Sequence, residues 1–156
     1  MDGYKKKKAP PKPSQRYVNW ALMSYLKRYS APRAHVKRVL WRKLEGCIAF
    51  HDGDRDEVSA WIEGALDQAV QGGMIDDERY VKDKVKSLLR RGGSSMGIAY
   101  KLRAKGIPRE MVDRALAEVA DAGFDHQWIS AATYVRRVRM GPFRVSEMDP
   151  KERYQK

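Results

Sequence analysis

Two segments of this chain end in the same way, about fifty residues apart. Ala65-Leu66 is followed by a helix stop at Gly73, and Ala115-Leu116 is followed at the same spacing by Gly123. Both segments carry apolar residues at helical spacing, and no stretch alternates apolar and polar residues as a half-buried strand does. Short helical units of this length bury their apolar faces by stacking. The repeat therefore predicts an all-α fold of tandem three-helix repeats stacked into an elongated helical array.

Capping residues and glycines predict where individual helices begin and end. Ser30 is the expected cap of the second helix, and Asp54 with Glu57 forms a capping box before the third. Asp76 or Asp77, and then Ser94 or Ser95, are the expected caps of the next two helices. Together with the glycine stops, these signals predict helices over 15–29, 31–44, 55–71, 77–91, 95–105, 108–121 and 126–139.

The same signals divide the chain into four parts. Residues 1–16 hold three prolines and six basic residues, and we expect them to form a disordered basic tail. Residues 17–75 and 76–123 are the two three-helix repeats. Residues 124–156 begin a third repeat but lack its second amphipathic helix, so this repeat is either truncated or degenerate. Ser146 or Asp149 supplies one more cap-like signal there.

The charge balance favours an anionic partner. There are 32 Lys and Arg residues against 20 Asp and Glu residues, a net charge of +12. Such an excess suits a polyanion or an acidic protein surface. No apolar run has the length of a membrane span. A single cysteine, Cys47, excludes an internal disulfide and fits the reducing cytoplasm, where we expect a monomer.

Basic residues concentrate on the middle helix of each repeat. The segments 31–44 and 95–105 contain no acidic residue, whereas the third helices are net acidic. Stacked repeats would align the middle helices into one basic strip. The predicted binding residues are Arg33, Lys37, Arg38, Arg42, Lys43, Arg90, Arg91, Lys101, Arg103, Lys105, Arg136, Arg137 and Arg139. Of the four tryptophans, we expect Trp41 to be exposed among these cations and the others, Trp20, Trp61 and Trp128, to pack inside.

No set of residues supports catalysis, a metal or a cofactor. Asp52, Asp54, Asp56 and Glu63 match four positions of a calcium loop, but Glu57 stands where that loop needs its turn glycine. We therefore interpret this segment as a polar loop and a helix cap. Gly92-Gly93 lacks the preceding strand and the following Gly-Lys-Ser/Thr of a nucleotide-binding loop. Cys47 is expected to be a small apolar residue or a free thiol near a helix end.

The chain resembles the RecX family of bacterial regulatory proteins. The resemblance rests on Asp76-Asp77-Glu78-Arg79-Tyr80, then Leu89-Arg90-Arg91-Gly92, then Leu102-Arg103-Ala104-Lys105-Gly106-Ile107, and it extends from about Tyr17 to about Met140. It implies tandem three-helix repeats. It also implies binding to the RecA recombinase filament on single-stranded DNA, with inhibition of strand exchange and co-protease activity and no chemistry of its own.

Two other classes of function are weaker. A helix-turn-helix regulator would read DNA bases with Ser30–Leu44 or Ser95–Gly106. Neither segment contains the Asn or Gln that reads base edges, and Arg and Lys alone suit phosphates or acidic surfaces. A metal-dependent enzyme built on Asp52–Glu63 is the least favoured. The residues leave open whether DNA is contacted directly, how the chain lies on a filament and how it inhibits.

Overall fold

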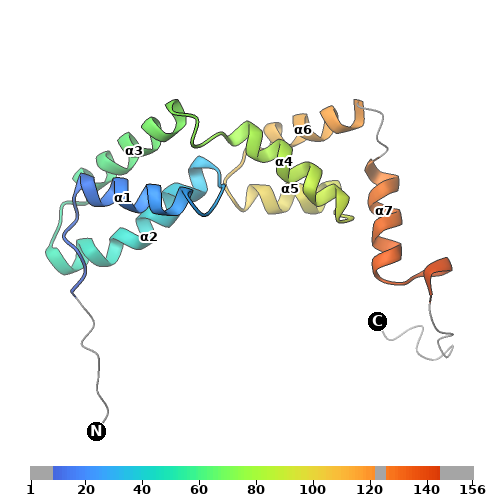
Figure 1. Cartoon of the computed structure of the whole chain (residues 1–156), viewed down its shortest axis with the longest axis horizontal. Helices are drawn as coiled ribbons and strands as arrows, with labels where there is room; N and C mark the ends of the chain where they lie inside the picture. Colours follow the sequence, from blue (N-terminus) through green and yellow to red (C-terminus); the bar gives the residue numbers. More distant parts are fainter. Residues whose placement is uncertain (1–8, 122–125, 145–156) are drawn as a thin grey trace, which may run out of the picture. The chain divides into compact units, whose positions relative to one another are not determined.

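The described part of the chain, residues 9–121 and 126–144 of a computed structural model, is helical and contains no strand. This confirms the predicted all-α fold of three-helix repeats (Figure 1). Gly123 and Asp125, the predicted end of the second repeat and start of the third, lie outside the described residues. The elements are α1 (Gln15–Leu26), α2 (Arg33–His51), α3 (Arg55–Gln71), α4 (Asp77–Arg90), α5 (Ser95–Arg103), α6 (Arg109–Asp121), α7 (His126–Arg137) and a short 3-10 helix, η1 (Gly141–Phe143).

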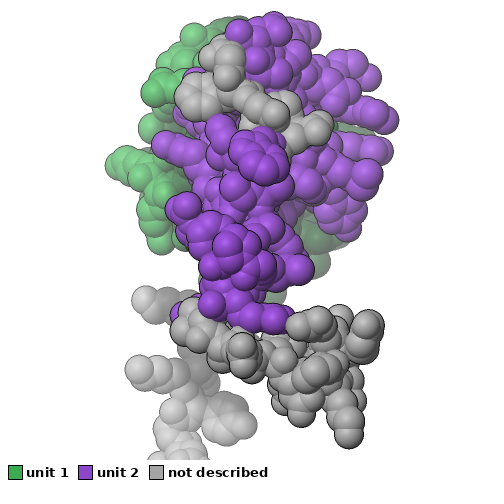
Figure 2. Space-filling model, turned by 90° about the vertical axis from the view of Figure 1, so that its right-hand side faces the viewer, with its two compact units in different colours: residues 1–80, 105–107 green, residues 81–104, 108–156 purple. Residues whose placement is uncertain are grey.

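The chain forms two compact units, which Figure 2 colours separately. The first comprises residues 1–80 with 105–107, and the second comprises residues 81–104 with 108–156. Helix α4 therefore begins in the first unit and continues in the second, and a three-residue segment after α5 belongs to the first unit. The compact units do not follow the sequence repeats, whose boundary we placed at residue 76.

In the first unit, α1, α2 and α3 all contact one another around one apolar core. Each helix contributes one stripe, for example Leu22 from α1, Leu40 from α2 and Ile62 from α3, and these side chains are almost fully buried. Burying each such side chain stabilises the fold by roughly 1.5–3 kcal/mol. The core is closed by Ala31 and Ile75, which lie in the connections before α2 and before α4.

The ordered fold begins earlier than the predicted tail boundary at residue 16. Ser14 caps α1 by accepting a hydrogen bond from the N–H of Tyr17, at 3.2 Å. Pro13 is buried, and the carbonyl of Pro10 lies 2.8 Å from Nε2 of His51. Prolines suit such a segment because they pack in extended chain without needing a hydrogen-bond donor. Residues 1–8 of the predicted tail lie outside the described residues.

Helix α2 differs most from its predicted range of 31–44. It begins at Arg33 and continues to His51, because Cys47 is buried and extends the apolar stripe by another turn. Ser30 does not cap it; Pro32 occupies the cap position and makes no side-chain hydrogen bond. The helix ends at Asp52, which adopts the left-handed backbone conformation (φ 49°) that a glycine usually adopts at the end of a helix.

The local signals around α3, α4 and α5 are confirmed. Asp54 caps α3 by accepting from the N–H groups of Asp56 and Glu57, at 2.8 and 3.4 Å. Asp76 caps α4 through the N–H of Arg79, and Ser94 caps α5 through the N–H of Gly97, at 2.9 and 3.2 Å.

The second unit buries the apolar stripes of α4, α5 and α6. Val85, Ile98 and Val112 represent these three helices and are at most 1% exposed. An ion pair between Lys82 of α4 and Glu118 of α6, at 3.0 Å, lies at the edge of this core. Helix α7 follows and ends before the expected break at Gly141-Pro142, where η1 begins. The cap-like residues Ser146 and Asp149 lie outside the described residues.

Three tryptophan predictions were wrong: one side chain is more buried than expected and two are more exposed. Trp41 is half-buried against the first core, with the Arg55 guanidinium 4.9 Å from its ring centroid. Trp20 and Trp128, which we expected to pack inside, are 56% and 72% exposed. Trp20 lies two residues from both Val18 and Leu22, which face the core, so a helix must turn it outward.

Candidate partner-binding surface

Two of the predicted binding cations are held within the first unit by acidic residues of α3. The Arg33 guanidinium donates to Glu63 at 2.8 Å and to Asp67 at 2.6 Å, and Lys37 forms an ion pair with the other oxygen of Glu63. These contacts join the start of the basic helix α2 to the acidic face of α3. Arg33 and Lys37 therefore serve the fold of the unit, and their charges are largely compensated.

The pKa values of this network follow from its hydrogen bonds. The hydrogen bond from Lys37, followed by that from Arg33, holds the pKa of Glu63 below its usual 4.5, although partial burial opposes this shift. The hydrogen bond to Asp67 is the largest cause that raises the pKa of Arg33. Both shifts favour the charged form, so the Glu63 carboxylate and the Arg33 guanidinium compensate one another.

A second set of predicted cations gathers around His35 on α2. Burial, followed by the positive charges of Lys105, Arg38 and Arg42, lowers the pKa of His35 below its usual 6.5. Lys105 reaches this cluster because the segment 105–107 packs on α2. Gly106 has a positive φ of 88°, and a Cβ built there would lie 2.6 Å from the Cβ of Ala34. Within the first unit, the fold thus brings Lys105, the last residue of the predicted helix 95–105, beside α2.

Lys43 lies on an aromatic face that is formed by Tyr17 and Trp20 and was not predicted from the sequence pattern. Its ammonium is 4.5 Å from the ring centroid of Trp20 and 5.9 Å from that of Tyr17. The two rings stack with centroids 5.5 Å apart. A cation over an indole ring is held by the ring quadrupole. The off-stripe position of Trp20 was the signal that would have revealed this face.

The remaining predicted cations lie in the second unit. All are exposed, and they come from the end of α4, from α5 and from the end of α7. Arg136 packs over the Phe143 ring at 5.2 Å, and Arg137 packs over Tyr134 at 5.5 Å. The other exposed cations of this set are Arg90, Arg91, Lys101, Arg103 and Arg139.

The chemistry of the acidic loop is that of a helix cap. The Asp54 carboxylate is directed at backbone N–H groups of α3, as the capping-box pattern predicted. Among the residues that the structure describes, no three His, Cys, Asp or Glu side chains cluster as metal ligands. Cys47 is a buried free thiol on α2, with its Sγ 3.8 Å from the Lys43 carbonyl oxygen.

Fold and surface together define a class: an all-helical protein of three-helix units with basic surface clusters. Residues 76–116 match the family described as RecX, second three-helix domain. The chain is 38% identical over 138 residues to regulatory protein RecX of Myxococcus xanthus, covering 88% of this chain and 73% of that protein. It is 31% identical over 144 residues to regulatory protein RecX of Agrobacterium fabrum, covering 90% and 74%. The chain belongs to the RecX family.

The relatives carry the name of a regulatory protein, not that of an enzyme. No solved structure matches the chain. Within residues 9–121 and 126–144, none of the helices has both the length and the apolar character needed to cross a bilayer.

Proposed function

We propose that this chain binds the RecA filament on single-stranded DNA and inhibits its recombinase and co-protease activities through a basic helical surface. Membership of the RecX family supports the class of function. We assign the contact to the basic residues predicted from the sequence, some in a primary role and others in a supporting role.

The observation that carries the proposal is the cation cluster around His35. Among the described residues, the charges that shift the pKa of the His35 ring are positive, and they belong to Lys105, Arg38 and Arg42. Concentrated charge of one sign creates a potential that attracts an oppositely charged surface. We therefore assign the primary contact to this cluster and give Arg33 and Lys37 a supporting role, because α3 compensates their charges.

The side chains of the basic helices suit an acidic surface or phosphates better than base edges. Neither α2 nor α5 contains Asn or Gln, and α5 contains no acidic residue. In α2 the only acid is Glu45, which lies 3.8 Å from Arg55. Sequence-specific reading of DNA as the primary function is therefore disfavoured.

The test is a double charge reversal, Arg38→Glu with Arg42→Glu. Filament binding should fall by about tenfold or more, since reversing two contact charges removes attraction and adds repulsion. Inhibition of RecA strand exchange and of RecA co-protease activity is measured in parallel. The matched control is Lys27→Glu with Arg28→Glu, which makes the same charge change at exposed positions after α1 of the same unit.

Titration against bare single-stranded DNA separates a filament contact from a DNA contact. We expect the Arg38/Arg42 variant to lose filament inhibition while the Lys27/Arg28 variant retains it. If the Arg38/Arg42 variant loses DNA binding but inhibits RecA at wild-type concentrations, the cluster does not engage the filament. If both variants lose filament binding equally, the loss is caused by the change in net charge and not by the position of the cluster.

A further inference from the structure

The second unit contains a pocket of about 540 Å³ between α5 and α7. Its walls are the loop after α4, the first residues of α5 and one face of α7. The lining side chains are neutral or cationic, and no acidic residue is among them. A pocket of this size and sign can hold an anionic ligand. None of its residues except Arg137 belongs to the predicted binding surface.

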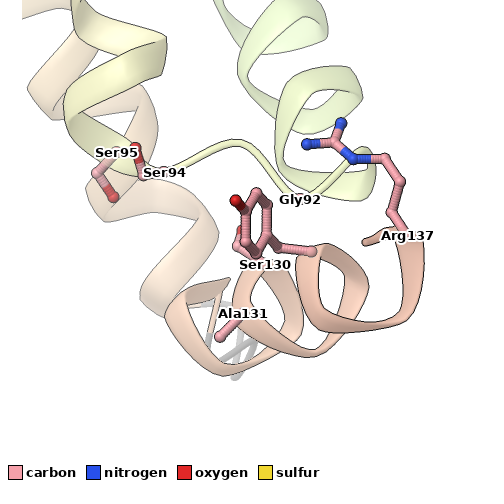
Figure 3. Close-up of a pocket in the computed structure, with 7 residues that line it drawn as sticks. Gly92, Ser94, Ser95, Ser130, Ala131 and Arg137 are labelled. Carbon is pink, nitrogen blue, oxygen red and sulfur yellow. The ribbon is translucent and has the colours of Figure 1, made fainter. Parts of the chain in front are cut away.

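One wall of the pocket is the positive end of a helix. Helix α5 is nine residues long and begins at Ser95, and the Ser94 hydroxyl satisfies the N–H of Gly97. The N–H groups of the first turn have no partner inside a helix, and the helix dipole adds positive potential there. Ser94 and Ser95 both line the pocket, and Figure 3 shows them at the start of α5.

The opposite wall holds a buried hydroxyl without a partner. Ser130 lies on α7, is only 6% exposed, and its Oγ makes no hydrogen bond. An unsatisfied buried polar group of this kind costs about 1–3 kcal/mol. Ser130 lines the pocket, and its backbone lies beside Gly92 of the loop after α4 (Figure 3). An acceptor atom of a bound ligand would remove this cost.

Arg137 supplies a full positive charge to the same wall. It lies two turns after Ser130 on α7, and its guanidinium stacks 5.5 Å from the ring centroid of Tyr134, which also lines the pocket. The ring restricts the freedom of the guanidinium without neutralising it. Arginine is well suited to phosphate because its planar fork donates two parallel hydrogen bonds.

A glycine, Gly92, allows the loop after α4 to pack closely against α7. Gly92 has a φ of 78°, and a Cβ built there would lie 3.0 Å from the backbone nitrogen of Tyr134 and 3.1 Å from the carbonyl oxygen of Ser130. Only a residue without a side chain allows the loop to approach α7 so closely. The geometry of the pocket therefore depends on this position.

We propose that this pocket binds a phosphate group, with Ser95, Ser130 and Arg137 as its donors. The phosphate is either that of a nucleic-acid backbone or a free phosphate. The loop between α4 and α5 differs from a nucleotide-binding loop, because it follows a helix and not a strand. The proposed site combines the N-terminus of α5 with side chains of α7. The proposal shares Arg137 with the filament contact, but it is tested separately, because it concerns a ligand taken by the isolated chain.

The test is a titration of the isotope-labelled full chain with inorganic phosphate, followed by NMR at constant ionic strength. Saturable shifts are expected at the amides of Ser95 and Met96 and in the 92–94 loop. Acetate and chloride are expected to cause no comparable saturable change. A separate titration with oligo(dT) identifies the source. Tighter binding at the same amides assigns the site to nucleic-acid phosphate, and binding of inorganic phosphate alone assigns it to a free phosphate.

Two variants and one control decide whether the pocket is the site. Arg137→Gln should weaken phosphate binding by about tenfold or more, the factor that one hydrogen bond to a charged group represents. Arg136→Gln is the matched control, since Arg136 stacks on Phe143 and does not line the pocket. Ser130→Ala should also weaken binding. Equal losses in the Arg136 and Arg137 variants, or unsaturable shifts spread over all basic residues, would overturn the proposal. So would a Ser130→Ala variant that is more stable but binds phosphate normally.

Discussion

The carboxylate of Asp77 accepts a hydrogen bond from the backbone N–H of Arg33, at 2.8 Å, although the two residues are 44 positions apart. Arg33 is the first residue of α2, so the N-terminus of this helix is capped by the first residue of α4. The acidic pair that marks the family resemblance thus has two separate duties. Asp76 caps its own helix, and Asp77 caps a helix of the preceding repeat.

Replacing Asp77 with Ala should destabilise the protein by about 0.5–2 kcal/mol, because the cap of α2 is lost. Asp77→Asn keeps an acceptor oxygen and should cost less. Urea denaturation of both variants measures the difference. Asp83→Ala, at an exposed acid of the same helix, is the control. If Asp77→Ala and Asp83→Ala behave alike, the contact with Arg33 contributes nothing to stability.

The Glu63 network predicts a loss of stability in acid. Hydrogen bonds from Lys37 and Arg33 lower the pKa of Glu63 in the folded state below 4.5. A lowered folded pKa contributes stability that is present above pH 4.5 and disappears as the pH falls through the folded value. Thermal unfolding between pH 6 and pH 3 should therefore show a smaller acid-induced loss for Glu63→Gln than for the wild type. Glu45→Gln, at a more exposed acid, is the comparison, and a wild-type slope in Glu63→Gln would contradict the assignment.

His35 provides a direct measure of the basic cluster. Burial and three cations lower its folded pKa below 6.5, so its contribution to stability is present above pH 6.5 and is lost as the pH falls through the folded pKa. Lys105→Gln removes one of these cations and should raise the pKa of His35, as followed by NMR of its ring protons. Lys101→Gln should leave it unchanged, because Lys101 is not among the charges that act on His35. An identical pKa in the wild type and the Lys105 variant would show that segment 105–107 does not pack on α2 in solution.

Gly106→Ala should destabilise the first unit for two reasons. The positive φ of 88° strains any side chain, and the new Cβ would lie 2.6 Å from that of Ala34. We expect a cost of at least about 1 kcal/mol. Gly141→Ala is the control for backbone strain alone, since Gly141 has a φ of 57° and nothing within 4 Å of its Cβ position.

A double variant isolates the clash. Combining Gly106→Ala with Ala34→Gly removes the opposing methyl group, so the two changes should cost less together than the sum of their separate costs. Strict additivity in chemical denaturation would mean that the two residues do not touch.

Local signals explain which parts of the fold could be predicted from the sequence. Helix α3 was predicted with its observed bounds, because its cap Asp54 and its stop at Gly72-Gly73 are adjacent to it in the chain. Helix α2 was misjudged at both ends. Its cap, Asp77, is distant in sequence, and its stop, Asp52, is a non-glycine residue in the left-handed region. Neither feature follows a local rule.

The candidate surface shows the same division. The cations of the surface could be named from the sequence, because acid-free helices are visible there. Which of them are compensated could not be predicted, since Glu63 lies 30 residues from Arg33 and only the packing of α2 on α3 brings them together. The pocket beside Ser130 depends on the approach of the 92–94 loop to α7, which no residue pattern reveals.

The membership of residues 105–107 in the first unit has a consequence for synthesis of the protein. A growing chain that has released only residues 1–75 from the ribosome holds α1, α2 and α3, yet it lacks the Asp77 cap and the buried side chains of Tyr80 and Ile107. The first unit can be completed only after α4, α5 and the segment 105–107 have all emerged. The two units therefore cannot fold strictly one after the other during synthesis. A nascent chain that pauses before residue 105 carries an incomplete first unit.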